Sequence, residues 1–415
     1  YLYYRNTLNK RLTDKKEELK YNEIVDLKKL PKCNQIPEEL QYKLVDYYIA
    51  SSYNSVCIGN QHYDYVSKDM LIELLNAGAR LVEIPICQKE VYYSSAPIVG
   101  TAYRGETLVT SLNLLELEDV CNVILANAFK KDNNKINYPL FLKLNLHTSN
   151  NYTLDKCADI ITNVFNKLLL NNEKYKWFPL GLEKLCNLLN KVIIICSDNY
   201  TGSKLRNIVV PLNKLYEEYH YSELGKYNAI KGDYYESDYN KLLSSKQQKK
   251  SLEVFERIFP SIDTIVKMEG EGDEDEGVSV SDGKGDKDIG KGKNNDIIKN
   301  KILDNSEILN KLSSYNKIGL CLVKPHNDED ITSKNFDFME ALKYGCQFIC
   351  MNYQVYDNHM KKYIEIFKKS SFRLKPSGLR YTELQIVTPD IEQEFERVSN
   401  NMVINNIKNN FKSNY

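Results

Sequence analysis

The sequence predicts an α/β protein in which two half-barrels, separated along the chain, form one (β/α) barrel. Short apolar runs alternate with amphipathic segments over residues 44–199, and the same alternation resumes near residue 317. Such alternation is typical of parallel strands joined by helical crossovers. Neither block has enough strands for a barrel, whereas the two together do, which favours a single barrel interrupted by a long insertion.

The first part of the chain divides into a lead-in and a half-barrel. Residues 1–40 are predicted as a helical lead-in that could end an EF-hand-like region, because apolar residues recur at helical spacing around “LTDKKEEL”. In the first half-barrel, residues 41–199, buried strands are expected at “LVEIPIC” (81–87), “PLFLKLNL” (139–146) and “KVIIICS” (191–197). The helices expected to cover them are “KDMLIELLNAG” (68–78), “LLELEDVCNVILANAF” (114–129) and “LDKCADIITNVFNKLLL” (154–170).

The alternating pattern stops after the first half-barrel. Residues 200–311 are predicted as a polar linker, and its insert at about 268–298 as disordered, since it has too few apolar residues to offset the entropy of ordering. The second half-barrel, residues 312–385, contains strand patterns at “KIGLCLV” and “FRLKP” and a helix and strand in “FDFMEALKYGCQFICMNYQ”. Residues 386–415 are expected to form a C-terminal extension.

Composition sets broad limits on function. The 415 residues include 56 basic and 56 acidic side chains, so net charge gives no argument for binding nucleic acid or bulk anionic membrane. The 10 cysteines form no C-x-x-C pairs, which is typical of reduced cysteines in the cytoplasm. No apolar run has the length of a membrane span. The chain lacks a signal peptide and an initiator methionine, so we expect it to be part of a longer protein. We expect that protein to be cytoplasmic and able to act at a membrane surface.

Six motifs, in the same order along the chain, resemble the X and Y regions of eukaryotic phosphoinositide-specific phospholipase C. In the X region, “LVDYYIASSYNSVCIGNQ” is similar to “LSHYFIASSHNTYLTGNQ”, and “YPLFLKLNLH” is similar to “YPVILSLENH”. “ELLNAGARLVEI” and “AYRGETL” extend this similarity, and “FMEALKYGCQFICMNYQ” and “FRLKPSGLR” resemble “EMWNGGCQIVALNFQ” and “YVLKPAFLR” of the Y region. The resemblance covers about residues 40–200 and 312–380. It implies a distorted TIM-type barrel with the X/Y linker between its halves.

The resemblance also implies a reaction. Members of this family cleave phosphatidylinositol 4,5-bisphosphate to diacylglycerol and inositol trisphosphate. The cleavage requires a base for the inositol 2-hydroxyl, an acid for the leaving oxygen and positive charge over the developing phosphorane. In the family, two histidines and a calcium ion with hard oxygen ligands supply these groups.

Most of these groups are replaced in this chain. Tyr53 and Arg104 stand at the two histidine positions. A tyrosine, with an ordinary pKa of about 10, is a poor base at neutral pH, and an arginine stays protonated. The four family calcium positions correspond to Asn54, Glu83, Pro85 and Asn145. Only Asn54 and Glu83 keep the family residue. One carboxylate in place of three weakens calcium binding, so we expect no metal cofactor.

The positions that contact the substrate in the family are also degenerate. They correspond to Ile195, Ser197, Leu322 and Lys324. His147 keeps a family histidine and is expected to be structural. The other histidines are expected on the surface or in loops: His62, His220, His326 and His359.

These replacements predict a catalytically inactive phospholipase C-like protein that acts as a scaffold or interaction module in signalling. Two alternatives stay open: an active, diverged phosphodiesterase that uses Tyr53, Arg104 and His147, and a module that binds a phosphoinositide headgroup through Arg104 and Lys324 without cleaving it. The expected partners are such a headgroup, a membrane surface or another protein, and no nucleic acid. We expect Tyr53 and Arg104 to pack against Glu83 and fill the pocket, because an unpaired buried carboxylate is costly. The alternative is an open mouth that binds an anion through Arg104.

Overall fold

The computed structural model describes residues 38–89, 95–129, 137–176, 178–212, 216–221, 312–325 and 331–382, together with eight residues between 3 and 14. The insert predicted to be disordered at 268–298 and the C-terminal extension at 386–415 lie outside the described residues. Most of the predicted lead-in also lies outside them.

Ten strands of the described residues form one sheet. Parallel neighbours run in the order β7 (Tyr216–His220), β8 (Leu320–Lys324), β9 (Phe348–Met351), β1 (Tyr47–Ser52), β2 (Leu81–Gln88), β5 (Leu140–Leu146) and β6 (Val192–Cys196). Three short strands pair antiparallel with this series: β3 (Pro97–Val99) on β2, β4 (Leu115–Glu116) on β3, and β10 (Phe372–Leu374) on β1. The strands predicted from apolar runs are therefore present within a few residues of their expected bounds.

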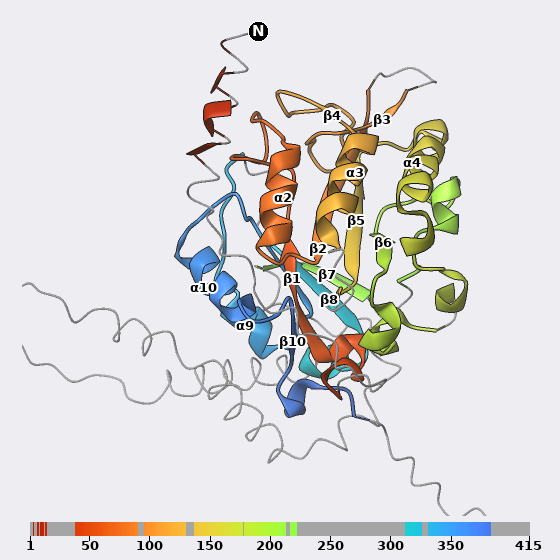
Figure 1. Cartoon of the computed structure of the whole chain (residues 1–415), viewed down its shortest axis with the longest axis vertical. Coiled ribbons are helices and arrows are strands. Elements are labelled where there is room, and N and C mark those ends of the chain that lie inside the picture. The colour runs from red at the N-terminus through yellow and green to blue at the C-terminus, as the bar shows by residue number, and fades with distance from the viewer. Residues whose placement is uncertain are drawn as a thin grey trace, which may run out of the picture. The chain divides into compact units, whose positions relative to one another are not determined.

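Helices cover the outer face of this sheet. They are α2 (Lys68–Asn76), α3 (Leu117–Ala128), α4 (Asn151–Phe165), α9 (Met339–Lys343) and α10 (Asn358–Phe367). Figure 1 shows α2, α3 and α4 side by side over β2 and β5, with α9 and α10 on the other side of β1. Short 3-10 helices lie at Glu38–Leu40, Leu44–Asp46, Asn166–Leu168, Glu173–Lys176, Leu180–Leu182, Leu185–Leu188, Lys204–Asn207 and Ser377–Leu379. Among the described residues, no helix has both the length and the apolar character needed to cross a bilayer.

Helices α2 and α10 begin where the sequence provides a side-chain cap. Ser67 accepts a hydrogen bond from the backbone N–H of Asp69 at the start of α2, and Asp357 accepts one from Met360 at the start of α10. Along α10, the apolar residues Met360, Tyr363 and Phe367 face the core, as their helical spacing predicts. Lys361 and Lys362 lie away from this buried face, and Lys368 and Lys369 follow the end of the helix.

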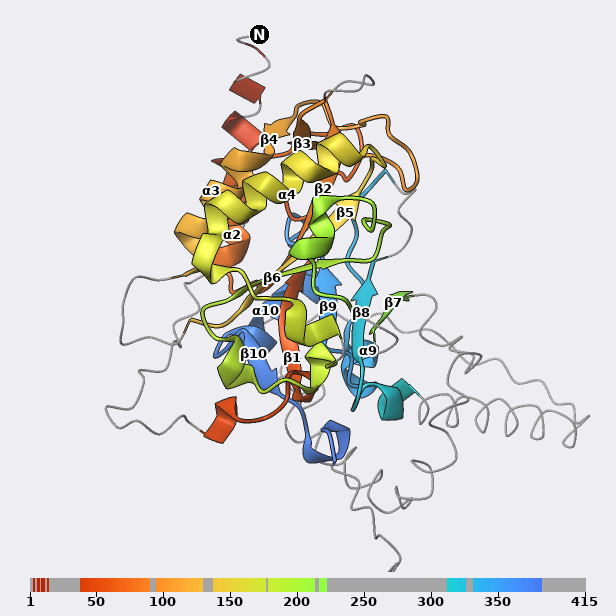
Figure 2. The ribbon, with the colours of Figure 1, turned by 90° about the vertical axis from the view of Figure 1, so that its right-hand side faces the viewer.

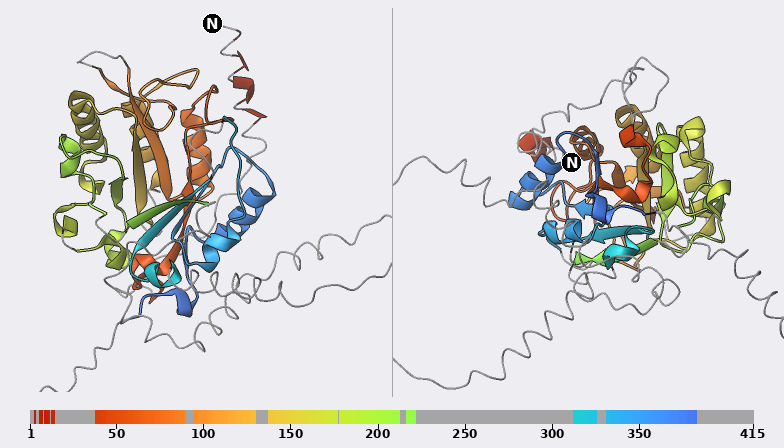
Figure 3. Two further views of the ribbon diagram at one scale, coloured as in Figure 1. Left: turned by 180° about the vertical axis from the view of Figure 1, so that it is seen from behind. Right: turned by 90° about the horizontal axis from the view of Figure 1, so that it is seen from below.

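Alternate residues of the strands face two different cores. On β5, Phe141 and Lys143 point into the barrel, whereas Leu142 and Leu144 pack against the outer helices. The interior is filled mainly by apolar side chains from strands of both half-barrels, including Ile49, Leu81, Phe141, Ile195, Leu322 and Phe348. Seen from below, the helices lie outside the strands (Figure 3). The predicted α/β fold with a distorted TIM-type barrel is confirmed.

The barrel is left open at one seam. Within the described part of the chain, no strand ladder joins β6 to β7; β6 forms a ladder with β5 and isolated bridges to Leu169 and Val209. Figure 2 shows β7 beside β8 at this edge of the sheet. Side-chain contacts between β7 and the other side of the seam therefore add to the few backbone bonds there.

The linker predicted for residues 200–311 starts too early. Tyr216–His220 form β7, which pairs in register with the whole of β8. The sequence of this segment, “YEEYH”, is polar and lacks the apolar residue that normally occupies an inward position of a core strand. Here Glu218 occupies that position. Its carboxylate finds a buried partner only in the folded barrel.

Strand β1 joins the two half-barrels directly. It pairs with β9 over Ile49–Ser52 and with β10 over Tyr47–Ile49, and both partners come from the second half-barrel. The hydroxyl of Tyr363 adds a side-chain link, since it donates to the carbonyl of Ile349 at 2.8 Å and accepts from the N–H of Ser51 at 2.9 Å.

Gln347 is a second buried link at the amino-terminal end of the barrel. Its amide nitrogen donates to the carbonyls of Val45, Asn316 and Gly319 at 3.1, 2.7 and 3.1 Å. Its amide oxygen accepts from the N–H of Cys321 at 2.8 Å. Every one of these groups is backbone, so the side chain satisfies polar atoms that strand pairing leaves over.

Cutting the chain between the half-barrels is expected to leave the barrel assembled. A protease site inserted within residues 268–298 would be cleaved, and the two fragments are expected to co-elute in size-exclusion chromatography, because β1 stays hydrogen-bonded to β9 and β10. Fragments that elute separately under native conditions would mean that the halves are independent domains.

Gln347→Leu is expected to destabilise the barrel by about 3 kcal/mol, because the apolar side chain leaves buried carbonyls and one N–H without partners. Chemical denaturation measures this loss. Gln41→Leu, at an exposed glutamine, serves as the control and is expected to change stability by less than about 0.5 kcal/mol. Equal effects of the two variants would contradict the role assigned to Gln347.

Candidate active site at the barrel mouth

A pocket opens where β1, β2 and β5 end, at the carboxyl edge of the parallel strands. Its volume is about 300 Å³, including the space at its open mouth. The lining residues are Tyr53, Asn54, Gln61, His62, Pro85, Thr101, Ala102, Arg104, Asn145 and His147. Half of the site positions predicted from the sequence meet here, in the place where barrels of this type carry their active sites.

The end of β1 positions two of these residues. The N–H of Tyr53 donates to the carbonyl of Met351 at 2.9 Å, which continues the pairing of β1 with β9 and keeps the tyrosine buried. Asn54 then adopts a φ of 43°, a left-handed conformation that asparagine tolerates better than most residues. Its side-chain amide donates to the amide oxygen of Gln61 at 3.1 Å. Asn54 is therefore held by its neighbour in the pocket wall.

Arg104 lies at the open side of the pocket. It precedes Gly105, whose φ of 77° allows the chain to turn back, and the turn is closed by a hydrogen bond from the N–H of Glu106 to the carbonyl of Tyr103 at 3.0 Å. The arginine is exposed. The expectation that Tyr53 and Arg104 pack against Glu83 and fill the pocket is wrong, because Glu83 has a different partner, described below.

Two histidines, His62 and His147, lie in the pocket wall, where the sequence predicted no catalytic histidine. His62 follows the “GNQ” motif and was expected in a loop or on the surface; it lies in a loop but is buried. Its ring stacks on Tyr103 with centroids 4.0 Å apart, and its Nδ1 lies 2.7 Å from the hydroxyl of Thr110. His147, at the end of β5, is also buried. His62 has no signal in the sequence beyond its place next to the motif.

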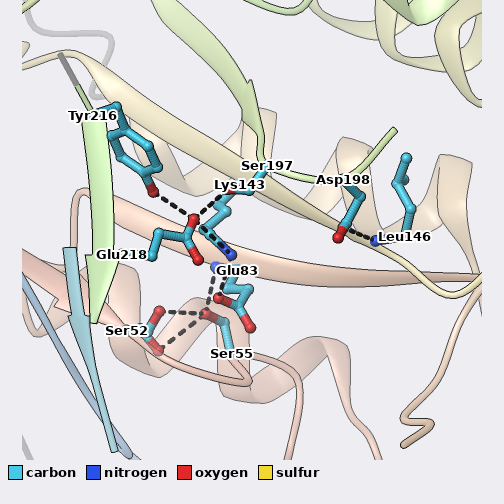
Figure 4. A network of polar contacts seen from close by, with 9 residues as sticks. All are labelled: Ser52, Ser55, Glu83, Lys143, Leu146, Ser197, Asp198, Tyr216 and Glu218. Atoms are coloured by element: carbon cyan, nitrogen blue, oxygen red, sulfur yellow. Dashed lines mark hydrogen bonds and ion pairs between the residues drawn. The ribbon is translucent and has the colours of Figure 1, made fainter. Parts of the chain in front are cut away.

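Below the pocket, Glu83 is paired with a lysine inside the barrel. Lys143 Nζ lies 3.2 Å from Glu83 Oε2 and 3.5 Å from Glu218 Oε1. The Glu83 and Lys143 side chains are 1% and 5% exposed, and Glu218 is 18% exposed. Figure 4 shows the ammonium between the two carboxylates, with Ser197 and Tyr216 also directed at Glu218. Neither Lys143 nor Glu218 is predicted from the sequence as a site residue.

The charges of this network are mutually dependent. Burial lowers the pKa of the Lys143 ammonium, but Glu83 and Glu218 outweigh it and raise that pKa above its ordinary value. Burial raises the pKa of Glu218, but Lys143 and the hydroxyls of Ser197 and Tyr216 outweigh it, so the pKa ends below its usual range. For Glu83, burial dominates and leaves its pKa raised, although Lys143 and Lys324 oppose it. The two carboxylates therefore favour the charged form of the lysine.

The residues present do not fit a calcium ion. Of the four family positions, Asn54, Pro85 and Asn145 carry no carboxylate, and the carboxylate of Glu83 is engaged by the Lys143 ammonium. Within the part of the chain that the structure describes, no three His, Cys, Asp or Glu side chains are grouped as metal ligands. A hard dication requires several anionic oxygens around an open position, which these residues do not provide.

The four predicted substrate positions lie outside the pocket lining. Ile195 and Leu322 are buried in the apolar barrel interior. Ser197 donates to Glu218, and the charge of Lys324 acts on Glu83 and Glu218. Ile195 and Leu322 therefore fill the barrel interior, Ser197 is exposed just after β6, and Arg104 lines the pocket.

Comparisons with known proteins agree with the motifs. A model of the family “Phosphatidylinositol-specific phospholipase C, X domain” matches residues 40–197. The “1-phosphatidylinositol 4,5-bisphosphate phosphodiesterase delta-4” of Bos taurus is 32% identical over 119 residues, which are 29% of this chain and 13% of the bovine protein. The chain thus matches only a small part of that relative's length.

Two solved structures are similar at a low level. The crystal structure of L. pealei PLC21 has a TM-score of 0.48 and 18% identity and covers 86% of this chain and 39% of its own. That of S. officinalis PLC21 has a TM-score of 0.47 and 18% identity, with coverage of 83% and 38%. By this sequence match and by the motifs, residues 40–197 are similar to the X domain of phosphatidylinositol-specific phospholipase C.

Proposed function

We propose that this chain is a phospholipase C-like protein that does not cleave phosphodiesters and acts as a scaffold or interaction module in signalling. One observation supports this most strongly: Lys143 Nζ lies 3.2 Å from Glu83, the one carboxylate retained among the family calcium positions. An ammonium so close to this carboxylate competes with any metal ion that approaches it. Without the metal, the reaction lacks the positive charge that stabilises its transition state.

The two positions of general acid-base catalysis support the same proposal. Tyr53 is buried at the end of β1, and Arg104 stays protonated at neutral pH. General acid-base groups each contribute roughly 10²–10⁴-fold to a rate. The combined replacement of both groups and of the metal ligands leaves very little of the family reaction, even though such losses do not add.

A second candidate function is binding of a phosphorylated headgroup without cleavage. The open pocket favours it, because an exposed arginine and two histidines line the same space as the side-chain amides of Asn54 and Asn145. A guanidinium is well suited to a phosphate, since it offers two parallel N–H donors. Such a module would work in the cytoplasm and reach a membrane surface when its ligand is a lipid headgroup.

The full chain is expected to release no inositol phosphate from vesicles that contain phosphatidylinositol 4,5-bisphosphate, at any calcium concentration up to the millimolar range. A rate at least about 10⁴-fold below that of an active phospholipase C is expected, from the loss of both acid-base groups. Calcium-stimulated release that Glu83→Ala abolishes would overturn the proposal. Release that is independent of calcium and abolished by His62→Gln or His147→Gln would instead support the diverged phosphodiesterase.

For headgroup binding, isothermal titration calorimetry with soluble inositol phosphates is expected to show heat that is unchanged by a chelator. Arg104→Gln is expected to weaken binding by about 10- to 100-fold, since it removes charged hydrogen bonds to the phosphate. Arg206→Gln, at an exposed arginine outside the pocket lining, is the matched control. Absence of heat with the unmodified protein would exclude the binding function and leave the scaffold.

A further inference from the structure

Lys143 connects three strands through one ammonium group. Its own strand, β5, pairs with β2 so that Lys143 lies directly opposite Glu83. Its Nζ also lies 3.5 Å from Glu218 on β7, which is on the far side of the open seam of the barrel. The contact therefore joins the first half-barrel to a strand that precedes the second half-barrel (Figure 4).

Glu218 is held both from across this seam and from its own strand. Ser197, directly after β6, donates its hydroxyl to Glu218 Oε1 across the seam, and Tyr216, on β7, donates its hydroxyl to the same oxygen at 2.6 Å. Because the described part of the chain has no ladder between β6 and β7, the contacts of Ser197 and Lys143 with Glu218 link the two sides of the seam. The carboxylate of Glu218 is their common acceptor, and the ammonium of Lys143 keeps it ionised.

Charge balance makes the ammonium necessary. Glu83 and Glu218 bring two carboxylates to one ammonium in an interior that excludes most water. Without a cation between them, they would repel each other and lose hydration, so one would have to take up a proton or the strands would separate. Lys324 contributes additional positive charge to both carboxylates.

We propose that Lys143 is a tethered counter-ion that takes the place of a bound metal ion in this barrel and holds β7 against β5 and β6 through Glu218. The stability of the folded chain is therefore independent of calcium. When the ammonium is removed, an external cation is expected to bind at Glu83 and Glu218 and to stabilise the fold. The proposal does not depend on whether the pocket binds a headgroup.

Thermal unfolding of the full chain tests this proposal with Lys143→Met, which keeps most of the side-chain volume and removes the charge. The unmodified protein is expected to have the same Tm in calcium and in chelator. Lys143→Met is expected to lower the Tm by about 10 °C in chelator, as loss of a buried ion-pair partner does. Millimolar calcium is expected to restore about half of this loss, because an ion that binds only the folded state stabilises it.

Two further variants separate charge from packing. Lys176→Met removes an exposed lysine that pairs with Glu173, and it is expected to change neither the Tm nor the response to calcium. In the Lys143→Met background, Glu218→Gln is expected to abolish the calcium response. If Lys143→Met alone does not fold, addition of Glu83→Gln and Glu218→Gln is expected to restore folding.

Three results would overturn the proposal. The first is stabilisation of the unmodified protein by calcium. The second is a Lys143→Met protein that unfolds in chelator at the Tm of the unmodified protein or that does not respond to calcium. The third is a triple variant, with both glutamates neutralised, that remains unfolded, since this would show that the shape of the lysine and not its charge is required.

Discussion

The position of β1 determines where both the barrel and the pocket form. This strand pairs with β9 along one edge, and with β10 and then β2 along the other, so it belongs to both half-barrels at once. The chain leaves β1 directly into Tyr53 and Asn54, and the N–H of Tyr53 continues the hydrogen bonding with β9. The pocket wall is therefore set by backbone pairing between segments about three hundred residues apart.

The charged side chains of the barrel interior balance without a metal ion. Glu83 and Glu218 face Lys143 directly, and Lys324 adds charge nearby. In the motif “YPVILSLENH” of the family, a serine stands where this chain has Lys143, and a glutamate stands where it has Asn145. A carboxylate has thus been lost at the mouth while a cation has been gained one layer below it. Inside the barrel, the ammonium of Lys143 lies against the carboxylates of Glu83 and Glu218.

The sequence predicted much of the framework, because framework signals are local. Apolar runs located β2, β5 and β6, and helical spacing located α2, α3 and α4 within a few residues. The order of the motifs gave the resemblance to the family and, through it, the alignment of Tyr53, Asn54, Pro85, Arg104 and Asn145, which all line the pocket. β7 was missed, because its inward-facing Glu218 gives it the appearance of a polar linker. A charged residue in a core strand can be recognised only together with its partner.

The sequence by itself determined which residues stand at the motif positions, and the resemblance to the family predicts from them that the acid-base groups and most of the calcium ligands are replaced, since residue identity at an aligned motif needs no coordinates. Only the tertiary structure decided what the replacements do in space. Lys143 and Glu218 are 75 positions apart in the printed sequence and carry no shared motif, yet the strand order places their charged groups 3.5 Å apart. His62 and His147 likewise enter one pocket only through the folding of separate loops. The physical reason is that electrostatic pairing and pocket lining depend on distances between strands, which the linear pattern of residues does not contain.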